Sequence, residues 1–220
     1  MTFSIIARDP ETGMFGGAAA TGSLCVGGWV LRGHLHAGLS ASQGASPSTL
    51  WGEAVLDVMR TGQSPQAAID AVVKADKGRE YRQLAALSPH GQTATFTGSD
   101  NTPAMGARFL DGGVIIGNML ASETVLDAAA DGFLSAKGAF ARRLLHALTA
   151  GEMAGGDSRG LLSAALLVLS PDRPPLTLRI DHSPTPLSDL SRLYEKATDG
   201  TYHEWSLQVP TLNDPERILD

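Results

Sequence analysis

Hydrophobic and polar residues alternate with two different periods along this chain, and the changes of period mark its structural elements. Near the start of the sequence four segments fit β-strands: residues 2–8, 14–22, 24–32 and 34–43. The first two are separated by Asp9, Pro10 and Gly13, which are residues that favour tight turns. We therefore expect the chain to begin with two β-hairpins.

Beyond these strands the apolar residues recur every three or four positions, which is the spacing of an amphipathic helix. The pair Ser46-Pro47 suits the N-cap and first position of one helix, and Gly62 suits its end. The pair Ser64-Pro65 begins a second helix in the same way. The inner faces of the two helices carry Leu50, Trp51, Ala54, Val55, Val58 and Met59, then Ala68, Ile69, Val72 and Val73.

Strands and helices continue in groups over the rest of the chain. The predicted elements are strands at 82–88, 92–98 and 114–120, helices at 125–134 and 140–148, strands at 163–170 and 176–180, and a helix at 187–194. Helices in pairs between sets of strands predict two stacked sheets covered by helices on both outer faces, an α+β fold. We expect one domain over residues 1–200. Residues 201–220 are expected to form a tail that packs on the domain or on a second subunit.

The composition argues against several classes of protein. The formal net charge is −6, Lys and Arg do not cluster, and aromatic residues make up 5%, so no nucleic-acid partner is expected. No apolar run reaches the roughly 18 residues of a transmembrane helix, so no membrane partner is expected. A single cysteine, Cys25, and the lack of a signal-peptide pattern favour the cytoplasm. Cys25 itself is expected in the core as a small apolar residue.

Thr2 directly follows Met1, and a methionine before a small residue is usually removed. Removal would leave the threonine hydroxyl beside a free α-amine. In N-terminal-nucleophile enzymes the hydroxyl attacks an amide carbonyl and the amine acts as the base. If Met1 is retained, the nitrogen of Thr2 is an amide and cannot accept a proton. Thr2 is therefore a candidate nucleophile, with the alternative that it is an ordinary β-branched residue at the start of a strand.

Four motifs together carry a resemblance to a known family. They are MTFSIIARDPETG at the start, REYRQL at 79–84, GNML at 117–120 and GGDSRGLLSAALLV at 155–168. Over roughly residues 1–195 the chain resembles the bacterial and archaeal family called domain of unknown function 1028. The resemblance implies the Ntn-hydrolase fold, a four-layer αββα sandwich. It leaves the reaction open, because the function of that family is not established.

A looser similarity to proteasome β-subunits, which also begin with a threonine on a strand, suggests residues around this nucleophile. It implies that Asn118, Asp157 and either Ser158 or Ser163 orient Thr2. Two differences from the proteasome, which has an Asp on its second strand and a Lys on its third, are evident in the sequence. Here the second strand, ending AAATGS, has no acid, and the first lysine of the chain is Lys74. The proteasome mechanism therefore cannot be transferred unchanged.

Further candidates lie at strand ends near the predicted hairpins. In SASQGASP a strand runs directly into a helix N-terminus, so Gly44 and Gln43 are candidate oxyanion donors. Arg32, the cation nearest to the first strands, is a candidate for holding a substrate carboxylate, since arginine stays protonated. His34 and His36 share one face of a strand, and His34 is a candidate substrate contact. Two histidines are half of a metal site, and no metal or other cofactor is predicted.

Two functional hypotheses follow. The first is an Ntn-type amidohydrolase of a small amide or N-acyl amino acid, with Thr2 as nucleophile. The second is a non-hydrolytic protein of the same fold that binds a small ligand or a protein partner. An enzyme with its active site at His34 and His36 is a third alternative. In each case apolar residues within the tail favour a homo-oligomer, expected to be a dimer.

Overall fold

The computed structural model describes residues 2–157 and 159–219, and it contains two antiparallel sheets. The larger sheet has six strands in the order β10-β9-β2-β1-β8-β7. Its strands are β1 (Thr2–Arg8), β2 (Phe15–Thr21), β7 (Ala104–Leu110), β8 (Gly113–Leu120), β9 (Ser163–Ser170) and β10 (Arg173–Ile180). The first strand is thus a central one, with β2 and β8 on its two sides.

The smaller sheet has four strands in the order β3-β4-β5-β6. Its strands are β3 (Leu31–His34), β4 (Gly38–Gln43), β5 (Gln83–Leu87) and β6 (Thr93–Thr97). The two sheets stack with β4 against β1 and β2. The ends of β1 and β4 that carry Thr2 and Gln43 therefore meet.

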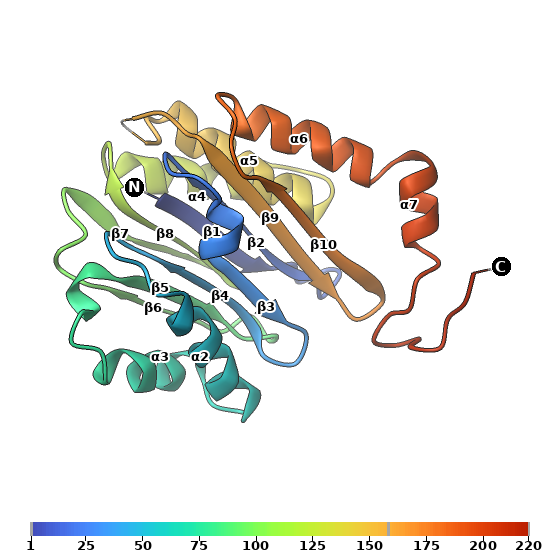
Figure 1. The fold of residues 1–220 in the computed structure, drawn as a ribbon, viewed down its shortest axis with the longest axis horizontal. Helices are drawn as coiled ribbons and strands as arrows, with labels where there is room; N and C mark the ends of the chain where they lie inside the picture. The colour runs from blue at the N-terminus through green and yellow to red at the C-terminus, as the bar shows by residue number, and fades with distance from the viewer. Residues whose placement is uncertain (1, 158, 220) are drawn as a thin grey trace.

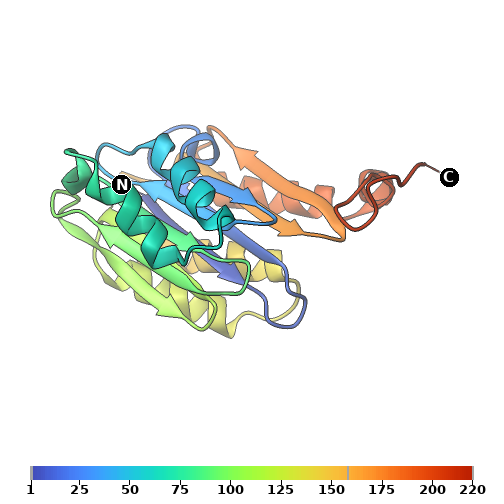
Figure 2. The same cartoon turned by 90° about the horizontal axis from the view of Figure 1, so that it is seen from below.

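Helices cover the outer faces of the two sheets (Figures 1 and 2). The long helices are α2 (Thr49–Arg60), α3 (Pro65–Lys74), α4 (Thr124–Ser135), α5 (Phe140–Met153) and α6 (Pro186–Ala197). The first two pack on the four-stranded sheet, and the other three pack on the six-stranded sheet. Among the described residues no helix combines the length and apolarity needed to cross a membrane.

Three apolar cores separate these layers. One lies between the six-stranded sheet and its helices, one between the two sheets, and one between the four-stranded sheet and α2 and α3. The central core contains Ile6 and Leu39, which are completely buried. Burial of this apolar surface is the main force that holds the layers together. The result is a mixed α+β fold of the kind that the order of elements predicts.

The predicted strand over 24–32 is wrong in its first part, because residues Val26–Trp29 form the short helix α1. It is a one-turn helix that contains Gly27 and Gly28 and packs on β9 and β10. A Cβ on Gly27 would lie 2.7 Å from the Arg179 side chain, so the close contact requires glycine. Cys25 precedes this helix in the left-handed conformation with φ 61°, half-buried rather than in the core.

Three other features differ from the sequence-based prediction. The edge strand β7 was not predicted, because its residues are mostly half-exposed and show no clear alternation. The helix α2 begins at Thr49 with Ser48 as its N-cap, two residues later than expected. The tail contains the helix α7 (Gly200–Ser206), which packs against α6. Asp199 caps this helix by accepting a hydrogen bond from the Gly200 N–H.

Candidate active site

Thr2 lies at the beginning of β1, where three strands of the larger sheet meet. It pairs with Thr21 of β2 and with Asn118 of β8. The Thr2 hydroxyl donates a hydrogen bond to Thr21 Oγ1 at 3.1 Å. Both threonines line a cavity of about 430 Å³. The polar lining also includes Ser23, Gln43 and Arg159, and the apolar lining includes Leu24, Val26, Trp29, Val30 and Met119.

A buried glutamine holds Thr2 from the opposite sheet. Gln43 Nε2 donates to the Thr2 carbonyl at 3.1 Å, to Gln83 Oε1 at 2.8 Å and to Asn118 Oδ1 at 3.3 Å. Gln43 Oε1 accepts from the Ser4 hydroxyl at 2.7 Å. The two hydrogens of this amide already have acceptors. Gln43, a predicted oxyanion donor, is therefore placed to position the Thr2 backbone.

Gln83 extends this network toward the other strands of both sheets. Its Nε2 atom donates to Thr97 Oγ1 at 2.9 Å, to the Gly117 carbonyl at 2.9 Å and to the Gly106 carbonyl at 3.1 Å. Gln83 and Gln43 are both almost completely buried. Buried amides are stable only when they are hydrogen-bonded, so this network fixes the geometry between the sheets. Gln83 was not predicted, although it lies within the motif REYRQL.

Asn118 is the least satisfied polar group near Thr2. Its side chain is completely buried, and Nδ2 has no hydrogen-bond partner among the described residues. The next residue, Met119, lines the cavity and has φ 54°, which is the left-handed region that a methionine seldom adopts. The Met119 N–H donates to the Asn101 carbonyl at 3.0 Å, which stabilises this conformation. Backbone strain of this kind is concentrated at functional sites.

Asp157 supports the turn after β2 from a buried position. Its carboxylate accepts from the Gly22 N–H at 2.7 Å, and a Cβ on Gly22 would lie only 2.1 Å from Asp157 Oδ2. The Arg159 side chain donates to the same carboxylate at 2.9 and 3.1 Å. Burial opposes ionisation of Asp157, but the hydrogen bonds from Arg159 and Gly22 outweigh it and hold its pKa below the ordinary value.

Gly44 forms the corner between β4 and the segment that leads to α2. Its φ is +138°, and a Cβ there would lie 2.5 Å from the Tyr81 carbonyl oxygen. The next N–H group, that of Ala45, is already bonded to Asn101 Oδ1 at 2.9 Å. Asn101 also donates to the carbonyls of Glu80, Arg82 and Gly98. No sequence motif pointed to Asn101, which fixes both Gly44 and Met119 at the cavity.

Ser163 is buried beside the cavity, and its hydroxyl both donates and accepts a hydrogen bond. It donates to the Ser23 carbonyl at 2.8 Å and accepts from the Val26 N–H at 3.0 Å. It therefore holds the loop before α1 and makes no hydrogen bond with Thr2 within the described chain. Met1 and Ser158, which also entered the sequence-based hypotheses, lie outside the described residues.

Two residues predicted as substrate contacts lie away from the cavity. Arg32 bonds Glu53 at 2.7 Å and the carbonyls of Leu31 and Gly28, and it does not belong to the cavity lining. The side chain extends toward α2, where Glu53 attracts it. The cation that the described part of the lining contains is instead Arg159, which belongs to the motif GGDSRG.

His34 lies at the far end of β3, where it pairs with Gly38. Partial burial lowers its pKa, and Arg60 and His36 lower it further. The rings of His34 and His36 are 5.6 Å apart. Within the part of the chain that the structure describes, no three His, Cys, Asp or Glu side chains form a group that could hold a metal ion.

The model of the family of unknown function DUF1028 matches residues 2–190. The chain is a member of the DUF1028 family. The crystal structure of protein SPO2555 from Silicibacter pomeroyi, also matched by the DUF1028 model, is 57% identical to this chain. The match covers 100% of this DUF1028 chain and 99% of that one, with a TM-score of 0.96. No curated protein matches this DUF1028 chain.

Proposed function

We propose that this DUF1028 protein is an N-terminal-nucleophile hydrolase of a small amide, with Thr2 as the nucleophile after removal of Met1. The observation that carries the proposal is the position of Thr2. Its hydroxyl lines the cavity, and its carbonyl is held by the buried Gln43. Two stacked antiparallel sheets with helices outside, and a threonine at the start of a central strand, support assignment to the Ntn-hydrolase fold.

The chemistry follows from the groups at the end of β1. The Thr2 hydroxyl attacks the amide carbonyl, and its proton passes to the free α-amine, whose ordinary pKa is about 8. The amine then returns the proton to the nitrogen of the leaving group as the C–N bond breaks. Water hydrolyses the resulting ester and regenerates Thr2. Thr21 Oγ1, 3.1 Å from the Thr2 oxygen, orients the hydroxyl before attack.

The negative charge on the attacked carbonyl oxygen requires donors fixed in advance. We assign this role to the Gly44 N–H and to Asn118 Nδ2. Gly44 lines the cavity, and Asn118 pairs with Thr2 and has a buried N–H₂ group without a partner among the described residues. An unsatisfied buried donor costs about 1–3 kcal/mol, so its retention beside the nucleophile favours a functional role.

The lining also indicates the class of substrate. Arg159 is the charged residue among the described residues of the lining, and its side chain is 55% exposed. Two of its nitrogens bond Asp157, which holds the guanidinium at the cavity. Leu24 and Trp29 provide an apolar wall. An N-acyl amino acid, with an apolar acyl group and a free carboxylate, matches both features.

A second function, non-hydrolytic binding of the same class of molecule, is favoured by one observation. The described lining residues include no Asp, Glu, His or Lys. The only base available to Thr2 within that set would be its own α-amine. A chain with a blocked amine would therefore bind the amide in this cavity without cleaving it.

The decisive experiment begins with N-terminal sequencing and intact mass of protein purified at low expression. Protein that begins at Thr2 is then assayed against a panel of N-acyl amino acids. Thr2→Ala should abolish turnover and preserve binding, whereas Thr2→Ser should retain turnover. Ser23→Ala is the matched control, because Ser23 is another hydroxyl of the lining. Full turnover by Thr2→Ala would exclude the hydrolytic mechanism, and retention of Met1 on every molecule would favour the binding function.

A further inference from the structure

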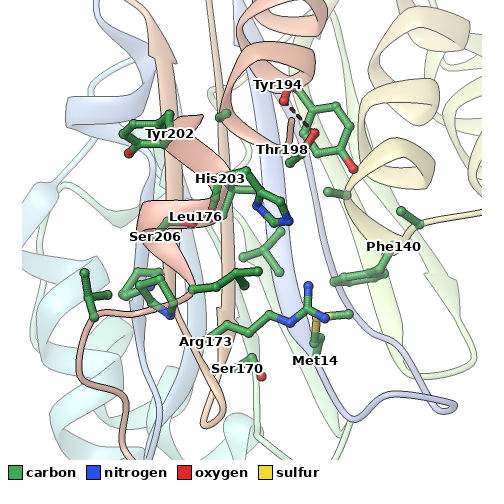
Figure 3. A pocket seen from close by; sticks show the side chains of 18 of the residues that line it. Met14, Phe140, Ser170, Arg173, Leu176, Tyr194, Thr198, Tyr202, His203 and Ser206 are labelled. Atoms are coloured by element: carbon green, nitrogen blue, oxygen red, sulfur yellow. Dashed lines mark hydrogen bonds between the residues drawn. The ribbon is translucent and has the colours of Figure 1, made fainter. Parts of the chain in front are cut away.

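A second cavity, of about 300 Å³, lies at the opposite end of the six-stranded sheet from Thr2. It is bordered by Met14, just before β2, and by the N-terminus of α5, the strand β10, and the helices α6 and α7 (Figure 3). Strand β1 pairs its Thr2 end with Thr21 and its Arg8 end with Phe15, so the two cavities lie at different ends of β2. The second cavity is therefore a separate site.

The walls of this cavity are largely apolar. Phe140 of α5, Leu176 of β10 and Tyr194 of α6 form its inner side, and Trp205 of α7 contributes to the outer side. A cavity of this size falls at the lower end of the range for small-molecule sites, which are typically apolar with a few polar groups that orient the ligand. Here the polar groups are Arg173, His203 and several hydroxyls, and the lining contains no Asp or Glu among the described residues.

Arg173 differs from the other arginines of the described chain. Each of the others donates to a carboxylate or a carbonyl oxygen. Arg173 has no hydrogen-bond or ion-pair partner within residues 2–157 and 159–219. Figure 3 shows the Arg173 side chain and the His203 ring among the side chains that line the cavity. The cavity thus combines apolar walls with a cation that is available to an anion.

We propose that this second cavity binds an amphipathic carboxylate, with the apolar chain between Phe140, Leu176 and Trp205 and the carboxylate on Arg173. A guanidinium binds a carboxylate through two parallel hydrogen bonds, which fixes the head group. His203 contributes a further polar contact. Charge complementarity selects an anion over a neutral molecule, and the apolar walls select a hydrocarbon chain over a small inorganic ion.

The helix α7 is part of this site, because Tyr202, His203 and Trp205 belong to its wall. The family model ends at residue 190, before this helix begins. The site therefore depends on a segment outside the stretch that defines DUF1028. It is also independent of the hydrolase proposal, since no residue of the lining is shared with the Thr2 cavity.

Calorimetric titration of the full chain with octanoate and with octan-1-ol tests the proposal. Octanoate should bind, and Arg173→Gln should weaken its binding by about tenfold while leaving octan-1-ol unchanged. Trp205→Ala should weaken both ligands, since it removes part of the apolar wall. Arg192→Gln is the control, because Arg192 is an exposed arginine of α6 outside the cavity.

Three outcomes would overturn the proposal. The first is the absence of octanoate binding to the unmodified chain at millimolar concentration. The second is octanoate binding that Arg173→Gln does not weaken relative to Arg192→Gln. The third is octanoate binding that Trp205→Ala does not weaken. Circular dichroism and thermal unfolding of each variant show that it is folded before its binding is compared.

Discussion

Thr2 and Asn118 lie directly opposite each other in the antiparallel strands β1 and β8. The strand end that carries the candidate nucleophile is therefore next to a completely buried carboxamide whose Nδ2 has no partner among the described residues. Gln43 contacts both, through the Thr2 carbonyl and Asn118 Oδ1. This pairing connects the geometry of the sheet with the proposed oxyanion donor.

Asn118→Leu should separate catalysis from stability. Leucine has a similar shape and removes the unsatisfied donor, so the free energy of unfolding should change by less than about 1 kcal/mol. Turnover of an N-acyl amino acid should fall at least about tenfold, because one oxyanion donor is lost. Steady-state kinetics and urea unfolding of the same preparation measure both. Full turnover by the variant would show that Asn118 Nδ2 is not a donor to the substrate.

Gln43→Met should destabilise the fold by about 2–4 kcal/mol, because several buried groups lose their partner together. The Thr2 carbonyl, the Ser4 hydroxyl and Gln83 Oε1 are each bonded to the Gln43 amide. Urea unfolding provides the measurement. Gln92→Met is the control, since this glutamine is exposed and the change should stay within about 0.5 kcal/mol. Equal losses for the two variants would contradict the positioning role of Gln43.

Two glycines with positive φ test whether the corner at Gly44 is sterically restricted. Gly44→Ala places a Cβ 2.5 Å from the Tyr81 carbonyl, whereas Gly62→Ala, at φ +88°, meets nothing within 4 Å. Gly62→Ala should cost about 1 kcal/mol from backbone strain alone. Gly44→Ala should cost clearly more, because the backbone must also move. Thermal unfolding of the two variants compares them, and a smaller loss at Gly44 would refute the predicted contact.

Arg159 and Arg32 provide a paired test of substrate recognition. Arg159→Gln should raise KM for an acidic amide by about tenfold and leave KM for its neutral ester unchanged, since a charge-assisted contact is lost. Arg32→Gln should change neither value, because Arg32 bonds Glu53 outside the cavity. Kinetics on the matched acid and ester provide the comparison. A rise in KM for the acid with Arg32→Gln alone would restore the assignment made from sequence.

Asp157 should make the stability of the protein depend on pH in the acid range. Its pKa in the folded state is lower than the ordinary value of 3.8, so the carboxylate stabilises the fold above that value. The contribution is lost as pH falls through the lowered pKa. Asp157→Asn should therefore cost about 1–3 kcal/mol at pH 7 and progressively less below about pH 4.

Urea unfolding at several pH values measures this difference for the Asp157 variant. Asp70→Asn is the control and should show a small difference, because Asp70 is an exposed residue of α3 whose carboxylate accepts a hydrogen bond from the Gln66 side chain. The lowered pKa of Asp157 is assigned to its contacts with Arg159 and Gly22. This assignment would be contradicted if the loss in free energy of unfolding caused by Asp157→Asn were the same at pH 2 as at pH 7.

Much of the fold follows from local patterns in the sequence. The strands at 2–8, 163–170 and 114–120 and the helices after Ser64 and around Leu144 match the structure closely, because their burial imposes a regular spacing of apolar residues. The family resemblance is confirmed by the DUF1028 model. The motifs that carried it also contain Gln83 and Arg159, although their roles were not evident from residue type.

Other features depend on contacts between distant segments. The sequence pattern predicts a strand at the glycines of α1, because the close packing of Gly27 on Arg179 joins residues that are distant in sequence. The edge strand β7 is held in place by its pairing with β8. The local alternation of apolar and polar residues does not predict this pairing.

The sequence by itself determined the order of the layers, the family, and the candidate residues Thr2, Gln43, Gly44 and Asn118, which the tertiary structure brings to one place. Only the tertiary structure decided which arginine enters the cavity. Arg32 and Arg159 are equivalent in charge, but Glu53 of α2 holds the first and Asp157 holds the second. A side chain takes its direction from the groups that approach it across the fold, and those groups are distant in sequence.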